Sequence, residues 1–308
     1  MRFVVTGASG HLGASLAKLL VERRHDVLGI VRETSDLYRL EGVLERITLA
    51  HAGLEDMSAA APAIEAFRPD VAVHLGWTGV TAQHRNSDAQ ITTNVTGTLD
   101  FFRIVRDAGC SAFVGLGSQA EFGPYEVSLT EDLPVRPLTA YGVAKLSCGL
   151  LTAKLAELAG MRHAWVRLIA TYGPADDRNH LIPAVALQLL HGQVPQLSPG
   201  GQLCDYLYVD DAAEALALLG ENATASGTFV LGSGQVHSVR EICELIRDRV
   251  DPSATLDFGA VPYRPDQVMH LEAEITRINQ ATGWTPATSL QEGLTKTVDY
   301  FRAIEAGQ

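Results

Sequence analysis

The stretch Val4-Val5-Thr6-Gly7-Ala8-Ser9-Gly10-His11-Leu12-Gly13 decides the fold of this chain. An apolar run that ends in glycines spaced as GxxGxxG, followed by apolar residues at helical spacing, predicts a strand, a tight turn and a helix. Gly7 permits the turn, Gly10 lets the backbone approach a pyrophosphate, and Gly13 allows close helix–strand packing. Because a helix N-terminus offers free N–H groups and a positive dipole end, the turn predicts a dinucleotide-binding site.

Beyond this turn, apolar runs alternate with helical patterns, which is typical of a parallel sheet covered on both faces. The expected strands are Arg2–Thr6, Val27–Val31, Ile47–Ala50, Val71–Leu75, Ala112–Leu116, His163–Ile169, Leu207–Val209 and Gly227–Leu231. The expected helices are His11–Arg24, Met57–Phe67, Ile91–Ala108, Tyr141–Ala159, Ala212–Leu219, Val239–Val250, Glu272–Gly283 and Leu290–Ile304.

The rhythm of strands and helices breaks after residue 170, where prolines interrupt the chain. We therefore expect an α/β fold: a Rossmann doubly wound parallel sheet with a smaller mixed C-terminal substrate lobe. Residues 1–169, with a return at about 204–231, form the expected dinucleotide-binding domain. Residues 170–203 and 232–308 form the expected substrate-binding lobe.

Composition narrows the range of partners. The chain has 308 residues, with 24 Lys and Arg against 36 Asp and Glu, a formal net charge of −12. An acidic surface argues against nucleic acid and anionic membranes as partners. No apolar run reaches about 18 residues, so no membrane span is expected, and the N-terminus does not resemble a signal peptide. The four cysteines lack metal-binding spacing, so we expect no metal site and a cytoplasmic location.

The end of the second strand bears on the choice of cofactor. An NAD site normally carries a carboxylate there, which binds the adenosine ribose. This chain has Val31 and Arg32 at that place, and a guanidinium can pair bidentately with a 2′-phosphate. The sequence favours NADP(H) over NAD(H), and a solvated surface role for Arg32 is the alternative.

Three polar residues form a candidate catalytic group. Tyr141 and Lys145 form a YxxxK motif, and a spacing of four places both side chains on one face of a helix. A nearby ammonium favours the phenolate form of tyrosine, so we expect Lys145 to lower the pKa of Tyr141. Ser118 follows the fifth strand, at the edge of the sheet where ligands bind. Its hydroxyl can donate to a carbonyl while Tyr141 transfers the proton.

With these residues the chain resembles the extended short-chain dehydrogenases/reductases, in particular the NAD-dependent epimerase/dehydratase family that acts on nucleotide sugars. Further segments in the family's order extend the resemblance to nearly the full length. They are His74-Leu75-Gly76-Trp77, Asn94-Val95-Thr96-Gly97-Thr98, Ser118–Gly123, Arg167 with Tyr172-Gly173-Pro174, Tyr208-Val209-Asp210-Asp211, Tyr263-Arg264-Pro265 and Gly283-Trp284-Thr285-Pro286.

The resemblance implies two sets of binding residues besides the catalytic Ser118, Tyr141 and Lys145. The cofactor set is Gly7, Ser9, Gly10, His11, Leu12, Gly13, Arg32, Gly53, Leu54, Leu75, Gly76, Asn94, Tyr141 and Lys145. The substrate set is Trp77, Thr78, Gln119, Glu121, Asn179, His180 and Arg264. It also implies a homodimer formed by the two long helices, Ile91–Ala108 and Tyr141–Ala159.

The chain also departs from the family pattern. Gly53 stands where an adenine-side Asp is usual, Ala170 replaces an Asn, and Leu203-Cys204-Asp205 lacks a customary arginine. Substrate pyrophosphate binding would then depend on Arg264 and other groups, or the substrate carries no nucleotide.

The sequence pattern argues against one function of the family and leaves four others open. The 4,6-dehydratases carry Asp-Glu after the active-site Ser or Thr, and this chain has Gln119-Ala120, which argues against dehydration. Arg32 favours NADPH-dependent reduction of a 4-keto-6-deoxy nucleotide sugar. A nucleotide-sugar 4-epimerase using NAD(P) is the first alternative. Reduction of a non-sugar carbonyl and a non-catalytic NADP-binding regulator are the others.

Overall fold

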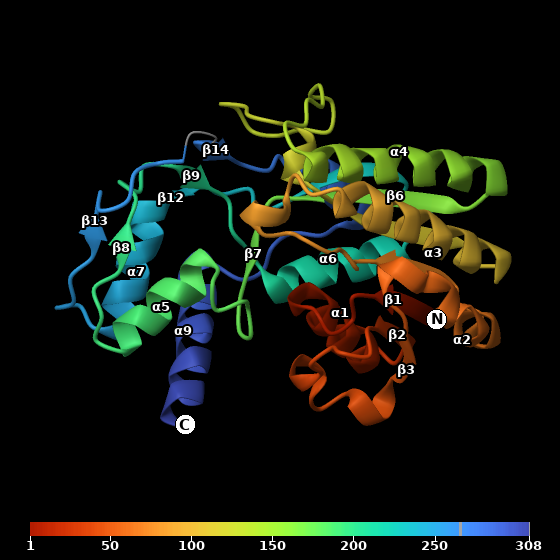
Figure 1. Cartoon of the computed structure of the whole chain (residues 1–308), viewed down its shortest axis with the longest axis horizontal. Helices are drawn as coiled ribbons and strands as arrows, with labels where there is room; N and C mark the ends of the chain where they lie inside the picture. The colour runs from red at the N-terminus through yellow and green to blue at the C-terminus, as the bar shows by residue number, and fades with distance from the viewer. Residues whose placement is uncertain (265–266, 308) are drawn as a thin grey trace.

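The computed structural model describes residues 1–264 and 267–307, so Pro265, in the late arginine-containing segment, lies outside the described residues. The larger of two lobes is built on a seven-stranded sheet in the order β11-β6-β5-β4-β1-β2-β3 (Figure 1). All neighbouring strands run parallel. The strands are β1 (Arg2–Thr6), β2 (Asp26–Val31), β3 (Thr48–His51), β4 (Val71–His74), β5 (Ala112–Ser118), β6 (Arg162–Leu168) and β11 (Gly227–Leu231). This order confirms the predicted doubly wound sheet, whose switch point lies between β1 and β4.

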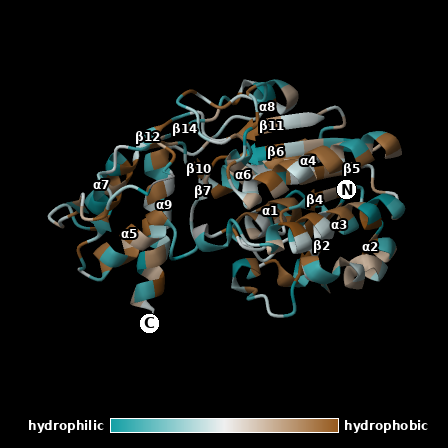
Figure 2. Ribbon diagram, turned by 45° about the horizontal axis from the view of Figure 1, so that its top comes forward, coloured by the Kyte–Doolittle hydropathy of each residue, from teal (hydrophilic) through white to brown (hydrophobic). Residues whose placement is uncertain are grey.

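Helices cover both faces of the sheet. On one face α1 (His11–Glu22) packs against α6 (Val209–Glu221), and their apolar side chains share a core with β1 and β11. On the other face lie α2 (Ala61–Phe67), α3 (Thr96–Asp107) and α4 (Ala140–Ala159), with Ile64, Phe101 and Ala156 in a second core. The strands between these layers carry mostly apolar residues, as buried parallel strands require (Figure 2).

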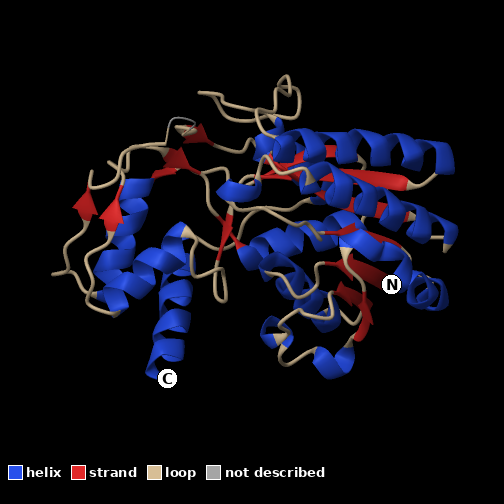
Figure 3. Ribbon diagram, viewed as in Figure 1, coloured by secondary structure: helices blue, strands red, loops and turns tan. Residues whose placement is uncertain are grey.

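The smaller lobe is a three-helix layer edged by short strands (Figure 3). Its helices α5 (Leu181–Leu190), α7 (Val239–Val250) and α9 (Leu290–Ala306) pack on one another around their own apolar core. The short strands are β8 (Gln196–Leu197), β9 (Leu203–Cys204), β12 (His237–Ser238), β13 (Asp257–Phe258) and β14 (His270–Leu271). A two-stranded ribbon of β7 (Thr171–Tyr172) and β10 (Leu207–Tyr208) connects the lobes (Figure 2).

One tail helix lies apart from this lobe. The sequence predicts a helix at Glu272–Gly283 within the C-terminal lobe, whereas the structure has only α8 (Thr276–Thr282). This helix packs against β11 and α6, so part of residues 232–308 lies with the larger lobe.

Two predicted helices are interrupted at their N-terminal ends. The expected helix Met57–Phe67 begins as a 3-10 segment, η3 (Leu54–Ala60), with non-helical backbone at Asp56, and becomes α-helical only at α2. The expected helix Ile91–Ala108 begins as a π-helical segment, η5 (Gln90–Val95), which buries Gln90 and Asn94. Further 3-10 turns are η1 (Tyr38–Leu40), η2 (Leu44–Arg46), η4 (Ala82–His84) and η6 (Gln119–Glu121). Within the described residues, none of the helices has both the length and the apolar character that a membrane span requires.

Candidate active site

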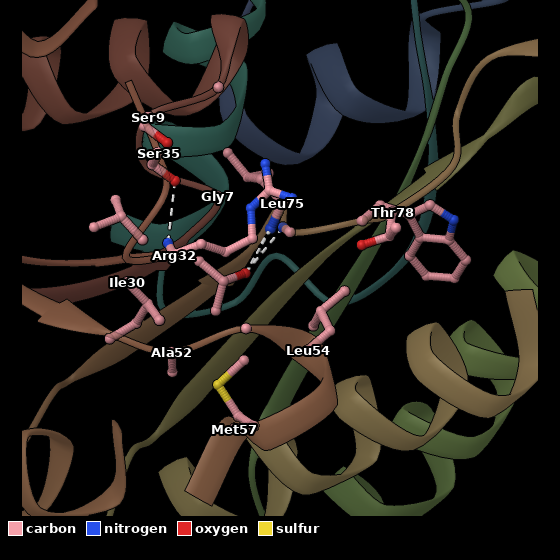
Figure 4. A pocket seen from close by; sticks show the side chains of 16 residues that line it. Gly7, Ser9, Ile30, Arg32, Ser35, Ala52, Leu54, Met57, Leu75 and Thr78 are labelled. Carbon is pink, nitrogen blue, oxygen red and sulfur yellow. Dashed lines mark hydrogen bonds between the residues drawn. The ribbon is translucent and has the colours of Figure 1, made fainter. Parts of the chain in front are cut away.

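The first pocket lies at the carboxyl ends of β1, β2, β3 and β4, and we call it the dinucleotide pocket (Figure 4). Its volume is ≈ 200 Å³. The lining residues are Thr6, Gly7, Ser9, Gly10, Ile30, Val31, Arg32, Ser35, Ala52, Gly53, Leu54, Met57, Leu75, Gly76, Trp77 and Thr78. The pocket therefore includes eight of the expected cofactor residues, and it also includes Trp77 and Thr78, which we had expected at the substrate.

The backbone of the glycine turn has the shape that a bound pyrophosphate needs. Gly7 has φ +69°, and a Cβ at this position would lie 2.9 Å from the amide nitrogen of Gly76. A Cβ on Gly13 would collide with the carbonyl oxygen of Gly7, so only glycine lets α1 begin this close to β1. Since α1 points its N-terminus into this space, the residues fit a dinucleotide diphosphate.

A buried polar chain holds the floor of the pocket. The hydroxyl oxygen of Thr6 accepts hydrogen bonds from the amides of Leu75 (3.1 Å) and Gly76 (3.0 Å). The same hydroxyl lies 2.8 Å from His74 Nδ1, and His74 Nε2 lies 2.9 Å from the hydroxyl of Thr98. Burial, with a smaller contribution from Lys145, lowers the pKa of His74 to about 3, so the ring is neutral. These bonds fix the glycine turn against the end of β4.

Arg32 carries the charge of the dinucleotide pocket. It follows β2 directly, its backbone N–H donates to the hydroxyl of Ser35 at 3.1 Å, and its side chain is exposed at the pocket (Figure 4). Among the lining residues that the structure describes there is no carboxylate. Glu33, the next residue, is not among the lining residues; it is 82% exposed and lies 3.7 Å from His51.

Six expected cofactor residues do not line this pocket. Two of them, Tyr141 and Lys145, belong to the catalytic group described below. Leu12 is buried in the core, and Gly13 packs on the turn. His11 turns toward the smaller lobe, where its Nε2 lies 3.1 Å from the carbonyl oxygen of Pro174. Asn94 is fully buried, accepts from the amide of Thr78 (2.9 Å) and donates to the carbonyl of Thr78 (2.8 Å). Asn94 thus fixes the loop that lines the pocket.

The three expected catalytic residues come together beside Trp77. Ser118 is the last residue of β5, and its side chain favours the charged form of the Tyr141 phenol, which lowers the pKa of Tyr141. Tyr141 stands in the first turn of α4, which Thr139 caps by accepting from the amide of Gly142 at 3.2 Å. Lys145, one turn later, donates to the carbonyl oxygen of Leu116 at 2.6 Å.

The electrostatics of this group differ from the expectation that Lys145 lowers the pKa of Tyr141. Burial raises the pKa of the Tyr141 phenol, opposed by its hydrogen bond with Ser118 and by the charge of Arg85. Lys145 is directed at Leu116 and lies 3.8 Å from the centre of the Trp77 ring. Burial lowers the pKa of Lys145 to about 8. In this arrangement Tyr141 stays protonated at neutral pH, as a proton donor requires.

Trp77 joins the dinucleotide pocket to the catalytic group. Its ring meets that of Tyr141 edge-on, with centres 6.0 Å apart and an interplanar angle of 89°. Its indole N–H donates to the side-chain oxygen of Gln90 at 2.9 Å. Gln90 is fully buried and also donates to the carbonyls of Gly79 (2.7 Å) and His84 (3.0 Å). Gln90 thereby fixes both the Trp77 ring and the loop that follows it.

Glu121, expected at the substrate, is fully buried and lines neither the dinucleotide pocket nor the pocket between the lobes described below. Its carboxylate accepts from the amide of Ser118 (2.9 Å), the indole of Trp165 (3.0 Å) and the guanidinium of Arg167 (2.9 Å). All these partners are protein groups, so the structure corrects our expectation: Glu121 holds the end of β5 and thereby the position of Ser118.

A second, larger pocket of ≈ 920 Å³ lies between the lobes, and we call it the interlobe pocket. Four expected substrate residues line it, namely Gln119, Asn179, His180 and Arg264. Arg85 and Asp176 line it as well. The buried carboxylate of Asp176 lies 2.9 Å from His180 Nδ1 and 3.4 Å from His11 Nδ1. Asp176 thus connects the interlobe pocket to the first residue of α1.

Sequence reasoning missed Arg85, Gln90 and Asp176. Arg85 follows β4 within a polar loop, and ligands gather at the carboxyl ends of such strands, which could have singled it out. Asp176 lies two residues after the Tyr172-Gly173-Pro174 segment, but its partner His11 is far away in the sequence. Gln90 carries no local signal, since its side chain is buried by the π-helical start of the helix.

Known proteins share this sequence pattern over nearly the whole chain. The profile of the "NAD dependent epimerase/dehydratase family" matches residues 3–232. A UDP-glucose 4-epimerase of Mycolicibacterium smegmatis is 28% identical over 98% of this chain and 99% of that protein. A dTDP-glucose 4,6-dehydratase of Salmonella typhimurium is 24% identical over 98% of this chain and 93% of that protein.

Solved structures agree on the fold. The crystal structure of a UDP-glucose 4-epimerase with UDP-glucose, from Thermotoga maritima, superposes with a TM-score of 0.91 at 24% identity, over 99% of this chain and 100% of that one. The family match agrees with the two features found in the structure, the glycine turn and the Ser118–Tyr141–Lys145 group. The chain belongs to the NAD dependent epimerase/dehydratase family and is an enzyme of the extended short-chain dehydrogenase/reductase type.

Proposed function

We propose that this enzyme reduces the keto group of a 4-keto-6-deoxy nucleotide sugar with NADPH as the co-substrate. The observation that carries the proposal is the charge of the dinucleotide pocket. Its described lining residues include the cation Arg32 and no carboxylate, which suits a 2′-phosphate rather than a free ribose diol.

The residues of the chain divide the chemistry between them. NADPH, when bound, supplies the hydride for the carbonyl carbon. The proton for the carbonyl oxygen comes from the Tyr141 hydroxyl, which its raised pKa keeps protonated at neutral pH. The Ser118 hydroxyl donates to the same oxygen, and Lys145 binds the nicotinamide ribose. Glu121 keeps Ser118 at the end of β5.

The interlobe pocket is our proposed substrate site. Its volume of ≈ 920 Å³ suits a ligand of nucleotide-sugar size, and Arg85 and Arg264 favour an anionic one. Relatives act on UDP-glucose and dTDP-glucose, as their names state. We propose accordingly that residues 170–203 and 232–308, apart from α8, serve mainly to bind the substrate.

The cofactor preference is tested by titrating the purified enzyme with NADPH and with NADH. We expect NADPH to bind more tightly, and Arg32→Ala to weaken NADPH binding roughly 10- to 100-fold by removing a charge-assisted bond. NADH binding to the same variant is the internal control and stays unchanged. Equal affinities of the wild type for both cofactors would contradict the proposal.

The reaction is tested by mixing enzyme and NADPH with 4-keto-6-deoxy sugars linked to UDP, dTDP, CDP or GDP. Absorbance of the reduced cofactor should fall with at least one of them. Absence of NADPH oxidation with all four would overturn the assignment as a sugar-nucleotide reductase.

A 4-epimerase is the second candidate, favoured by the near full-length match to the Mycolicibacterium smegmatis UDP-glucose 4-epimerase. An epimerase must keep its oxidised cofactor through the cycle. Mass spectrometry of the cofactor released from freshly purified protein separates the two: tightly held NAD favours the epimerase, and empty or NADPH-exchangeable protein favours the reductase.

We further propose a cytoplasmic homodimer. Val143, Leu150 and Leu158 are 45%, 64% and 74% exposed along α4, next to α3, and their spacing places them on one apolar face. The four cysteines are free thiols, as in proteins of a reducing compartment. Light scattering should give twice the chain mass, and Leu150→Glu should yield monomers; a monomeric wild type would contradict the dimer.

A further inference from the structure

The loop that follows β4 docks on the N-terminus of the catalytic helix. The carbonyl oxygen of Arg85 accepts from the amide of Tyr141 at 2.8 Å, and the side-chain oxygen of Asn86 accepts from the amide of Ala140 at 3.0 Å. These two bonds satisfy amides that a helix start leaves without helical partners. The loop and the first turn of α4 are thus held as one unit.

This docking puts a cation beside the phenol of Tyr141. The Arg85 guanidinium lies 5.9 Å from the centre of the Tyr141 ring, within the range of a cation–π contact. Its Nε is 3.5 Å from the carbonyl oxygen of Val80, a long contact that holds it only loosely. The same side chain lines the interlobe pocket together with Gln119, next to Ser118.

The surroundings of the phenol contain few other charges. Lys145, on the same helix, is engaged with the carbonyl oxygen of Leu116 and the ring of Trp77. Glu121, from η6, disfavours a charged phenol, while the Ser118 hydroxyl at the end of β5 favours one. Arg85 is therefore the cation that lies against the Tyr141 ring, and its charge, like the Ser118 hydroxyl, opposes the effect of burial on the pKa of Tyr141.

We propose that Arg85 is a positioning residue that stabilises the negative charge left on Tyr141 when this phenol gives up its proton, a role that complements Lys145. The proton moves from the Tyr141 oxygen to the substrate carbonyl oxygen as the carbon accepts hydride, and the Arg85 guanidinium lies beside the ring of the resulting phenolate. The inference rests on the proposed proton transfer by Tyr141.

The direct test is the titration of Tyr141 itself, which needs no turnover. Fluorotyrosine, more acidic than tyrosine, is incorporated throughout the chain, and the fluorine NMR signal of position 141 is assigned with Tyr141→Phe. Arg85→Gln keeps the backbone bond to Tyr141 and removes the charge. We expect its Tyr141 midpoint to rise by about one pH unit. Arg85→Lys should restore most of the wild-type midpoint.

Two controls make this result specific. Arg103→Gln removes an exposed cation on α3 that pairs with Asp100, and it should leave the midpoint unchanged. Asn86→Ala loosens the helix cap without removing charge and should move the midpoint far less than Arg85→Gln. If Arg85→Gln does not fold, Arg85→Met, which keeps the aliphatic stem, takes its place.

An unchanged midpoint in the charge-removing variant overturns the inference, as does an equal shift in Arg103→Gln. If the KM for substrate rises while the midpoint of the Tyr141 titration is unchanged, Arg85 acts on the substrate alone and the inference is also wrong. Failure of the proposed reduction appears separately, as absence of NADPH oxidation by the wild type, and leaves the titration result interpretable.

Discussion

The dinucleotide pocket is lined by residues that all lie within the first 78 positions, where the chain leaves the ends of four neighbouring strands. The interlobe pocket draws its lining from Arg85 to Leu271 and from both lobes. Backbone amides and glycines set the shape of the dinucleotide pocket. Side chains that are held by partners distant in the sequence set the shape of the interlobe pocket. The comparison teaches that one pocket depends on local backbone geometry and the other on tertiary packing.

The largest effect is expected where the two pockets meet, at Tyr141. This phenol contacts Trp77 of the dinucleotide pocket and Arg85 of the interlobe pocket. Tyr141→Phe should lower kcat roughly 10²–10⁴-fold, because it removes the proton donor, while the Kd for NADPH changes far less. Tyr125→Phe, whose hydroxyl bonds to the Pro134 carbonyl, is the matched control. Full activity of Tyr141→Phe would show that Tyr141 is not the proton donor, and so that the two pockets do not meet at the reacting group.

The next largest effect tests whether NADPH affinity depends on the close packing of the glycine turn against the backbone at Gly76. Gly7→Ala brings a Cβ to within 2.9 Å of the Gly76 amide at a positive φ, so NADPH affinity should fall about 100-fold. Gly192→Ala has nearly the same φ, +67°, with nothing near its added Cβ. That control should lose about 1 kcal/mol of stability and keep its affinity. Equal losses of affinity in both variants would mean that backbone strain alone is responsible.

A smaller effect is expected at the link between the pockets. Asp176→Asn removes the acceptor of His180 and the partner of His11, so KM should rise severalfold, and stability should fall by about 1 kcal/mol. The hydrogen bond to Asp176 raises the pKa of His180. Such a group stabilises the fold below about pH 6.5, and the contribution disappears as pH rises through the raised pKa.

Urea unfolding at about pH 5.5 and about pH 8.5 measures this dependence. The difference between wild type and Asp176→Asn should be larger at the acidic value. A difference that is larger at the alkaline value would show that Asp176 does not interact with a protonated His180.

The smallest effect is expected at Glu33, next to Arg32 but outside the pocket lining. Since this carboxylate is 82% exposed and faces His51, Glu33→Gln should change the ratio of NADPH to NADH affinity less than about twofold. A large gain in preference for NADPH in this variant would show that Glu33 acts at the ribose after all.

The same contrast explains how much of the site is visible in the sequence. The glycine turn, the sheet and the spacing of Tyr141 and Lys145 follow from local periodicity, because residues that act together are neighbours in the chain. Glu121 looked available for substrate because its partners, Trp165 and Arg167, lie on β6. Only the paired strands show that its carboxylate is already engaged.

The sequence also did not predict the direction in which the pKa of Tyr141 shifts. A spacing of four correctly predicts that Lys145 follows Tyr141 by one turn, but not that the ammonium bonds to Leu116 and contacts Trp77. Likewise, Arg85 reaches Tyr141 only because its own backbone caps α4. Such contacts depend on how a loop docks, which no local pattern encodes.

The central claim, that NADPH is consumed as a co-substrate to reduce a sugar ketone, is tested most directly by isotope transfer. The enzyme is given NADPH deuterated at the transferable position together with a 4-keto-6-deoxy nucleotide sugar, and the product is analysed by mass spectrometry and NMR. One deuterium on C4 of the product sugar, with one equivalent of NADP formed, is the predicted result. A product without deuterium, or a sugar inverted at C4 with no net cofactor consumption, would contradict it.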